Sequence, residues 1–119
     1  MARFERGARL LKPAEFERVF KTGRRESGPW LTAVSAPQEQ IPRLGLAISR
    51  KQASRSVDRN RLKRQIRESF RQAQAQLPAC DIVVMAKPGA KLRPRAEIMA
   101  ELEKLWIRIA QRWSASSSS

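Results

Sequence analysis

One segment in the middle of the chain, residues 57–76, restricts the possible folds more than any other. Its apolar side chains recur every three or four positions, at Leu62, Ile66, Phe70 and Ala73. On a helix that turns about 100° per residue these side chains fall on one side. The opposite side is almost entirely basic. We therefore predict an amphipathic helix whose apolar side can pack on a sheet.

The flanking segments predict the remaining layers of an α+β fold. Ser56 is a suitable N-cap for the central helix and Pro78 ends it. Prolines at 13 and 94 introduce two further helices. Helices are predicted over residues 13–22, 57–76 and 95–113, and strands over 30–35, 44–49 and 81–86. The linker 36–43 predicts a hairpin loop, and a short extra pairing near 24–26 stays open. This order favours one mixed sheet packed by helices, with a βαβ crossover through the central helix.

The charge balance points to a polyanionic partner. Among 119 residues, 25 Lys and Arg stand against 11 Asp and Glu, which gives a net charge of +14. Between Arg50 and Arg71 nine basic residues stand against two acidic ones, so this segment carries +7, half of the total. A compact domain with this charge repels itself, and a nucleic acid or an anionic membrane surface would relieve the repulsion.

The membrane alternative is the weaker of the two. No stretch approaches the roughly 20 apolar residues that a spanning helix needs. The first twelve residues alternate charged and apolar side chains and contain no apolar run of the signal-peptide type. Cys80 is the only cysteine, which excludes a disulfide framework and a thiolate metal cluster. We therefore expect a cytoplasmic protein with no membrane partner.

The inventory of reactive side chains argues against a self-sufficient enzyme. The chain contains no histidine, the commonest general base and metal ligand, and no tyrosine. No Ser-His-Asp, Cys-His or zinc constellation can be assembled from it. We therefore expect no catalytic residue on this chain and assign no metal ligand to it, and Asp58 is only a weak candidate for one because arginines surround it.

The basic side of the central helix is the strongest candidate site. Six polar residues form a continuous arc there: Asn60, Arg61, Lys63, Arg64, Arg67 and Arg71. Arg59 lies nearer the apolar side, at the start of the helix. A solubilising helix face normally mixes both signs, whereas Glu68 is the one acid within this arc. The pattern therefore favours nucleic-acid binding, since guanidinium groups pair with phosphates and stack on bases.

Residues 59–68, with the sequence RNRLKRQIRE, resemble the RNR signature of the bacterial ribonuclease P protein family. Segments 16–23, 43–51, 81–84 and 102–106 are also similar to that family, so the resemblance spans nearly the whole chain. It implies an α-β-β-β-α-β-α fold with a left-handed βαβ crossover, which is ribosomal protein S5 domain 2-like. A single domain over residues 1–113 and a disordered serine-rich tail over 114–119 are the expected organisation.

The resemblance also implies a function. The family removes the 5′ leader from precursor tRNA, and its RNA subunit holds the catalytic Mg²⁺. By position, the helix residues expected to dock on that RNA are Arg59, Asn60, Arg61, Lys63, Arg64, Arg67 and Arg71. Phe16 and Phe20 match an aromatic wall of the leader cleft, and Ser49 and Lys51 match residues at a strand end. The RNA subunit and precursor tRNA are the expected partners, with no obligate protein partner.

Several alternatives remain open at this stage. An aromatic pair at positions i and i+4, such as Phe16 and Phe20, is more often plain core. A tyrosine that the family often carries on the neighbouring strand is missing here, and Trp30 or Thr32 lies nearby in the sequence. A ribosomal RNA-binding protein fits the size and charge equally well. A DNA-binding helix is disfavoured, because proteins of that kind are usually all-helical.

Overall fold

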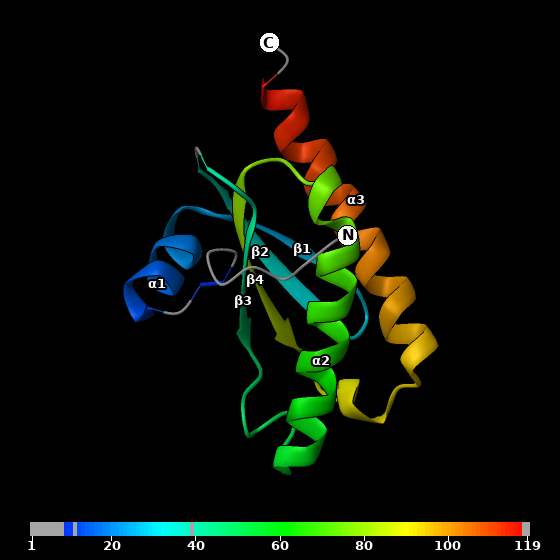
Figure 1. The fold of residues 1–119 in the computed structure, drawn as a ribbon. Helices are drawn as coiled ribbons and strands as arrows, with labels where there is room; N and C mark the ends of the chain where they lie inside the picture. Colours follow the sequence, from blue (N-terminus) through cyan, green and yellow to red (C-terminus); the bar gives the residue numbers. More distant parts are fainter. Residues whose placement is uncertain (1–8, 11, 39, 118–119) are drawn as a thin grey trace.

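The computed structural model describes residues 9–10, 12–38 and 40–117, and they form one sheet between two helical layers (Figure 1). The elements are α1 (Pro13–Thr22), β1 (Arg24–Ser27), β2 (Leu31–Pro37), β3 (Arg43–Ala47), α2 (Ser56–Ala73), β4 (Cys80–Ala86) and α3 (Arg95–Ser117). Short 3-10 turns follow α2 at Gln74–Gln76 and β4 at Ala90–Leu92. The predicted order is confirmed, and β1 is the extra strand that the sequence left open.

The sheet has the strand order β1-β2-β4-β3. β4 pairs antiparallel with β2 and parallel with β3, so the sheet is mixed as predicted. β3 and β4 run in the same direction and α2 returns between them, and the crossover has the left hand that the resemblance implies (Figure 1). α1 lies on one face of the sheet, and α2 and α3 lie on the other.

The hairpin predicted between β2 and β3 is wrong. The two strands are neighbours in the sequence, but β4 lies between them in the sheet and pairs with both. β4 is the most apolar of the strands, and its residues from Cys80 to Val84 are buried. A strand that is apolar on both faces is most stable at the centre of a covered sheet, so it takes the middle position.

The larger core lies between the sheet, α2 and α3. Leu62, Ile66 and Phe70 of α2 are at most 1% exposed, which confirms the predicted apolar side of this helix. Phe70 meets Trp106 of α3 edge to face, with ring centroids 5.8 Å apart. The indole N–H of Trp106 donates to the Ser69 hydroxyl at 2.8 Å, so the polar tip of this buried ring is satisfied. This packing determines which side of α2 faces outward.

The predicted helix ends need three corrections. The N-cap of α2 is Arg55 rather than Ser56, and its side chain makes no capping hydrogen bond. Arg59 donates from its guanidinium to the carbonyls of residues 53 and 54, which ties the start of the helix to the loop before it. The α-helical part of α2 ends at Ala73, ahead of the 3-10 turn. α3 continues past Trp113 to Ser117, because alanine and serine provide no stop signal of the Gly or Pro type.

Parts of the two terminal segments lie outside the residues that the structure describes. These are residues 1–8 of the charged N-terminal segment and residues 118–119 of the serine-rich tail. Within the described part of the chain, no helix is both long and apolar enough to cross a membrane.

Candidate nucleic-acid interface

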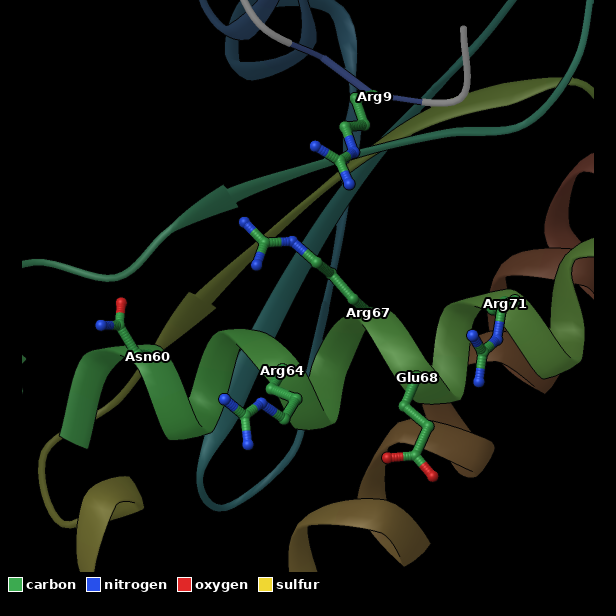
Figure 2. A pocket seen from close by; sticks show the side chains of 6 residues that line it. All are labelled: Arg9, Asn60, Arg64, Arg67, Glu68 and Arg71. Atoms are coloured by element: carbon green, nitrogen blue, oxygen red, sulfur yellow. The ribbon is translucent and has the colours of Figure 1, made fainter. Parts of the chain in front are cut away.

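The basic side of α2 faces outward as one surface. Asn60, Arg61, Arg64, Arg67 and Arg71 are exposed, and Lys63 is half-buried. All six come from one helix whose other side is in the core, and Figure 2 shows four of them, Asn60, Arg64, Arg67 and Arg71, along its length. The predicted arc is therefore present, and the segregation of charge from apolar side chains along α2 is close to complete. We call these six residues the α2 arc.

The acidic residues near the α2 arc are already paired. Glu68 accepts from the guanidinium of Arg95 on α3 at 2.8 Å. Asp58 lies 3.7 Å from Arg55 and 3.6 Å from Arg61. Arg61 also donates to the backbone carbonyl of Lys91, so its guanidinium is partly engaged. The two acids therefore leave most of the positive charge of the arc uncompensated.

Four cations of the α2 arc form no ion pair in the part of the chain that the structure describes. Across the described residues, no carboxylate lies within ion-pair distance of Lys63, Arg64, Arg67 or Arg71. Arg59 differs from them, because one of its nitrogens holds the carbonyls before α2 and its side chain is half-buried. The outward charge thus concentrates on the second to fifth turns of the helix.

A groove runs along the arc and includes a residue that the sequence analysis missed. It has a volume of about 470 Å³ and is lined by Arg9, Asn60, Arg64, Arg67, Glu68 and Arg71. Arg9 reaches over from the segment before α1, and its guanidinium faces that of Arg67 (Figure 2). The backbone places Arg9 there, since it forms a bridge with Leu44 of β3.

The two facing guanidiniums raise the local potential. Burial lowers the pKa of Arg67, and the charge of Arg9 lowers it further. Arg67 nevertheless keeps its positive charge at neutral pH, because an arginine pKa lies far above 7. The result is a concave site that favours an anion with several acceptor oxygens, and a phosphate has this chemistry.

The two candidate aromatic residues differ in burial. Phe16 is half-buried, and its ring rests on Gly45 of β3, where an added Cβ would lie 2.8 Å from the ring Cζ. Phe16 also lines a small hollow of about 130 Å³ that it shares with Lys63 and Arg67. Phe20, one turn further along α1, is 43% exposed, which is unusual for plain core. The Phe16 ring is therefore accessible beside the α2 arc, and the Phe20 ring is accessible on the exposed side of α1.

The other predicted cleft residues lie in exposed positions. Ser49 and Lys51 are exposed on the loop that follows β3, and neither lines the groove or the small hollow. Trp30 belongs to the face covered by α3, where Arg93 stacks on its ring at 4.8 Å. Thr32 lies within β2 on the α1 face, opposite Met85, whereas Trp30 precedes the strand and does not follow its alternation. Of the two candidates for the missing tyrosine, only Thr32 shares a face with α1.

A buried carboxylate holds α1 on the sheet, and the sequence analysis did not single it out. Asp81 of β4 has no exposed surface. It accepts two hydrogen bonds from Arg43 of β3 at 2.8 Å, one from Gln38 at 3.0 Å and one from Arg18 of α1. Arg43 extends the network to Glu15 of α1 at 2.9 Å. Burial by itself raises the pKa of Asp81, but the hydrogen bonds from Arg43 and Arg18 outweigh burial and lower it.

Together these features define a small basic α+β protein that exposes one cationic helix beside a sheet face with accessible aromatic rings. The family model described as Ribonuclease P matches residues 4–110. The ribonuclease P protein component of Methylococcus capsulatus is 49% identical over 116 residues, covering 97% of this chain and 91% of that protein. The chain belongs to the ribonuclease P protein family, whose members take part in processing the 5′ ends of tRNA.

Solved structures agree with this assignment. The ribonuclease P protein of Staphylococcus aureus superposes with a TM-score of 0.79 at 31% identity, covering 87% of this chain and 94% of that one. The protein from Thermotoga maritima gives 0.77 at 27% identity, covering 85% and 96%. The fold predicted from the resemblance is therefore confirmed by proteins of the same family.

The Asp81 network leads to a prediction about pH and stability. A lowered pKa means that the carboxylate stabilises the fold above its ordinary unfolded pKa of about 3.9, and that this contribution is lost as pH falls through the folded value. Asp81→Asn should lower the free energy of unfolding by ~1–3 kcal/mol at pH 7, with partly exposed arginines limiting the loss. Urea unfolding followed by circular dichroism measures the difference.

As the pH falls below the ordinary carboxyl pKa and through the lower folded pKa of Asp81, the gap between wild type and Asp81→Asn should shrink, because the wild-type carboxyl becomes neutral too. Glu17→Gln, at an exposed carboxylate on α1, is the control and should change stability by less than about 0.5 kcal/mol. A gap that stays constant with pH would show that the charge of Asp81 does not stabilise the fold.

Proposed function

We propose that the α2 arc docks this protein on the RNA subunit of ribonuclease P, and that the α1 side of the sheet binds the 5′ leader of precursor tRNA. The observation that carries the proposal is that four outward cations of the arc, Lys63, Arg64, Arg67 and Arg71, form no ion pair with a described carboxylate. Like charges on one helix repel, and a phosphate backbone placed among them turns that repulsion into attraction.

The chemistry of the arc favours RNA over a smooth anionic surface. Arginine predominates, and its planar fork pairs with two phosphate oxygens at once. The groove between Arg9 and Arg67 is concave, so it suits a ridge of phosphates better than a flat membrane. Asn60 at the rim can donate to or accept from a sugar hydroxyl or a base edge.

The protein is proposed to bind and position, while the RNA subunit performs the hydrolysis. Among the described residues, no three His, Cys, Asp or Glu side chains gather into a group that could hold a metal ion. Cys80 is buried, and burial together with the charge of Asp81 raises the pKa of its thiol to about 12, so it is a poor nucleophile. Mg²⁺ is therefore expected on the RNA subunit.

The leader is proposed to lie against Phe16 and Phe20, with Ser49 and Lys51 at the strand end of the same cleft. A single-stranded leader exposes unpaired bases, and each base that stacks on an aromatic ring contributes ~1–3 kcal/mol. The 43% exposure of Phe20 supports this role over a purely structural one. Lys51 would contribute charge to the backbone of the leader.

A reconstitution experiment tests the function directly. The protein is mixed with ribonuclease P RNA and 5′-labelled precursor tRNA at low Mg²⁺, where the RNA alone is slow. We expect accurate release of the leader only when protein and RNA are both present. Cleavage by the protein alone would contradict the division of labour, and no stimulation by the protein would favour a purely structural RNA-binding module.

The salt dependence of RNA binding tests the α2 arc. Arg64→Ala or Arg67→Ala should weaken binding to the RNA subunit and reduce the log–log salt slope by ~0.7–0.9 for each phosphate that the variant no longer neutralises. Arg112→Ala is the matched control, because it removes the same charge from α3, where Arg112 pairs with Glu26. If the arc variants and the control give the same slope as wild type, the α2 arc is not the interface.

The aromatic pair is tested with substrates that differ only in the leader. Phe20→Ala should lower affinity for leader-bearing tRNA roughly 5- to 100-fold because a base no longer stacks on the ring, and leave affinity for mature tRNA unchanged. Ile107→Ala is a control of similar exposure on α3. Equal losses for both tRNAs, or loss of the folded circular dichroism spectrum, would assign Phe20 to the core instead.

A further inference from the structure

The position of α1 is weakly determined by apolar packing. Among its ten residues, Val19 is the one that is fully buried. The half-buried Phe16 packs beside Val19 on the same cluster, so two side chains on one stripe supply the apolar contacts of this short helix. Most of the stability of such a helix comes from its tertiary contacts, and polar contacts on the other flank of Val19 therefore add the restraint on its rotation that this narrow stripe lacks.

Two ionic contacts supply that restraint, and both lead to Asp81. Arg18 pairs directly with the Asp81 carboxylate, and Glu15 is joined to it through Arg43. At about 100° per residue, Glu15 and Arg18 fall on one flank of Val19, while Phe16 and Phe20 fall on the other. Any roll that displaces the two anchors moves both aromatic rings.

Asp81 is well suited to act as a fixed reference point. It lies near the start of the central strand β4, has no exposed surface and accepts hydrogen bonds from three side chains. Arg43 approaches it with two nitrogens, each at 2.8 Å, and a bidentate pair of this kind restrains direction as well as distance. The position of the Asp81 carboxylate therefore restrains Arg43 and Arg18, and through these two side chains it restrains the position of α1.

We infer that Asp81 is a positioning residue for the leader cleft: through Arg18, Arg43 and Glu15 it sets the rotation of α1 and thereby the placement of Phe16 and Phe20. This inference rests on the proposed role of the two rings in leader binding. It assigns to a buried carboxylate, which no RNA can touch, an effect on substrate selection. The α2 arc is held by a separate core on the opposite face of the sheet, and it meets the α1 side only at the small hollow that Lys63 and Arg67 share with Phe16.

The test compares two pairs of matched variants in the holoenzyme assembled with the RNA subunit. Asp81→Asn and Glu101→Gln each neutralise a buried carboxylate, but Glu101 accepts the backbone N–H groups of Trp30 and Leu31 on the α3 face. Arg18→Gln and Arg112→Gln each remove a guanidinium from an ion pair, with side chains 42% and 38% exposed. The readout is the ratio of affinities for leader-bearing and mature tRNA.

We expect Asp81→Asn to lower this ratio roughly five- to tenfold, a fraction of the loss for a base that no longer stacks, and Arg18→Gln to lower it less. Both controls should leave the ratio unchanged, and all four variants should bind the RNA subunit with wild-type affinity. In ¹H–¹³C spectra of the free protein, the ring signals of Phe16 and Phe20 should shift in Asp81→Asn and Arg18→Gln only.

The outcomes separate this inference from the proposed function. If Phe20→Ala lowers the ratio while Asp81→Asn and Arg18→Gln do not, the positioning role is wrong and the cleft stands. If Phe20→Ala leaves the ratio unchanged, the cleft itself is wrong. Should Asp81→Asn fail to fold, Arg18→Gln decides the matter, because its side chain is partly exposed and the Asp81–Arg43 pair remains.

Discussion

The burial of one side of α2 is the interaction on which the rest of this structure depends. Leu62, Ile66 and Phe70 are removed from water between the sheet and α3, and each contributes roughly 1.5–3 kcal/mol. That packing leaves a single possible direction for the basic side chains of the same helix. The hydrophobic effect therefore orients the charges, although it acts on none of them directly.

Acidic residues in this protein serve mainly to hold the fold together. Asp81 joins α1 to the sheet, Glu101 of α3 accepts N–H groups at the start of β2, and Glu68 ties α2 to α3. Glu26 binds Arg112 across β1 and α3. Because these carboxylates are engaged in internal contacts, few remain to neutralise the outward cations. Half of the net charge of +14 lies in residues 50–71, on the segment that would meet RNA, where it favours association.

Sequence reasoning was reliable where a signal is local. The periodicity of α2, the proline that opens α1 and the apolar run of β4 each predicted the right element. It was wrong about the pairing of β2 with β3, because pairing depends on which strand can occupy the centre of the sheet. It missed Arg9, since nothing in the neighbouring residues indicates that this segment bridges to β3 and reaches α2.

The sequence by itself determined the amphipathic helix, the excess of cations on one side of it and the absence of histidine chemistry, since these follow from residue type and spacing. Only the tertiary structure decided that Arg9 and Arg67 face one another and that Asp81 holds α1. It also decided that Thr32, rather than Trp30, shares a face with the aromatic pair. These relations join residues far apart in the chain, and the free energy of packing the whole sheet sets them.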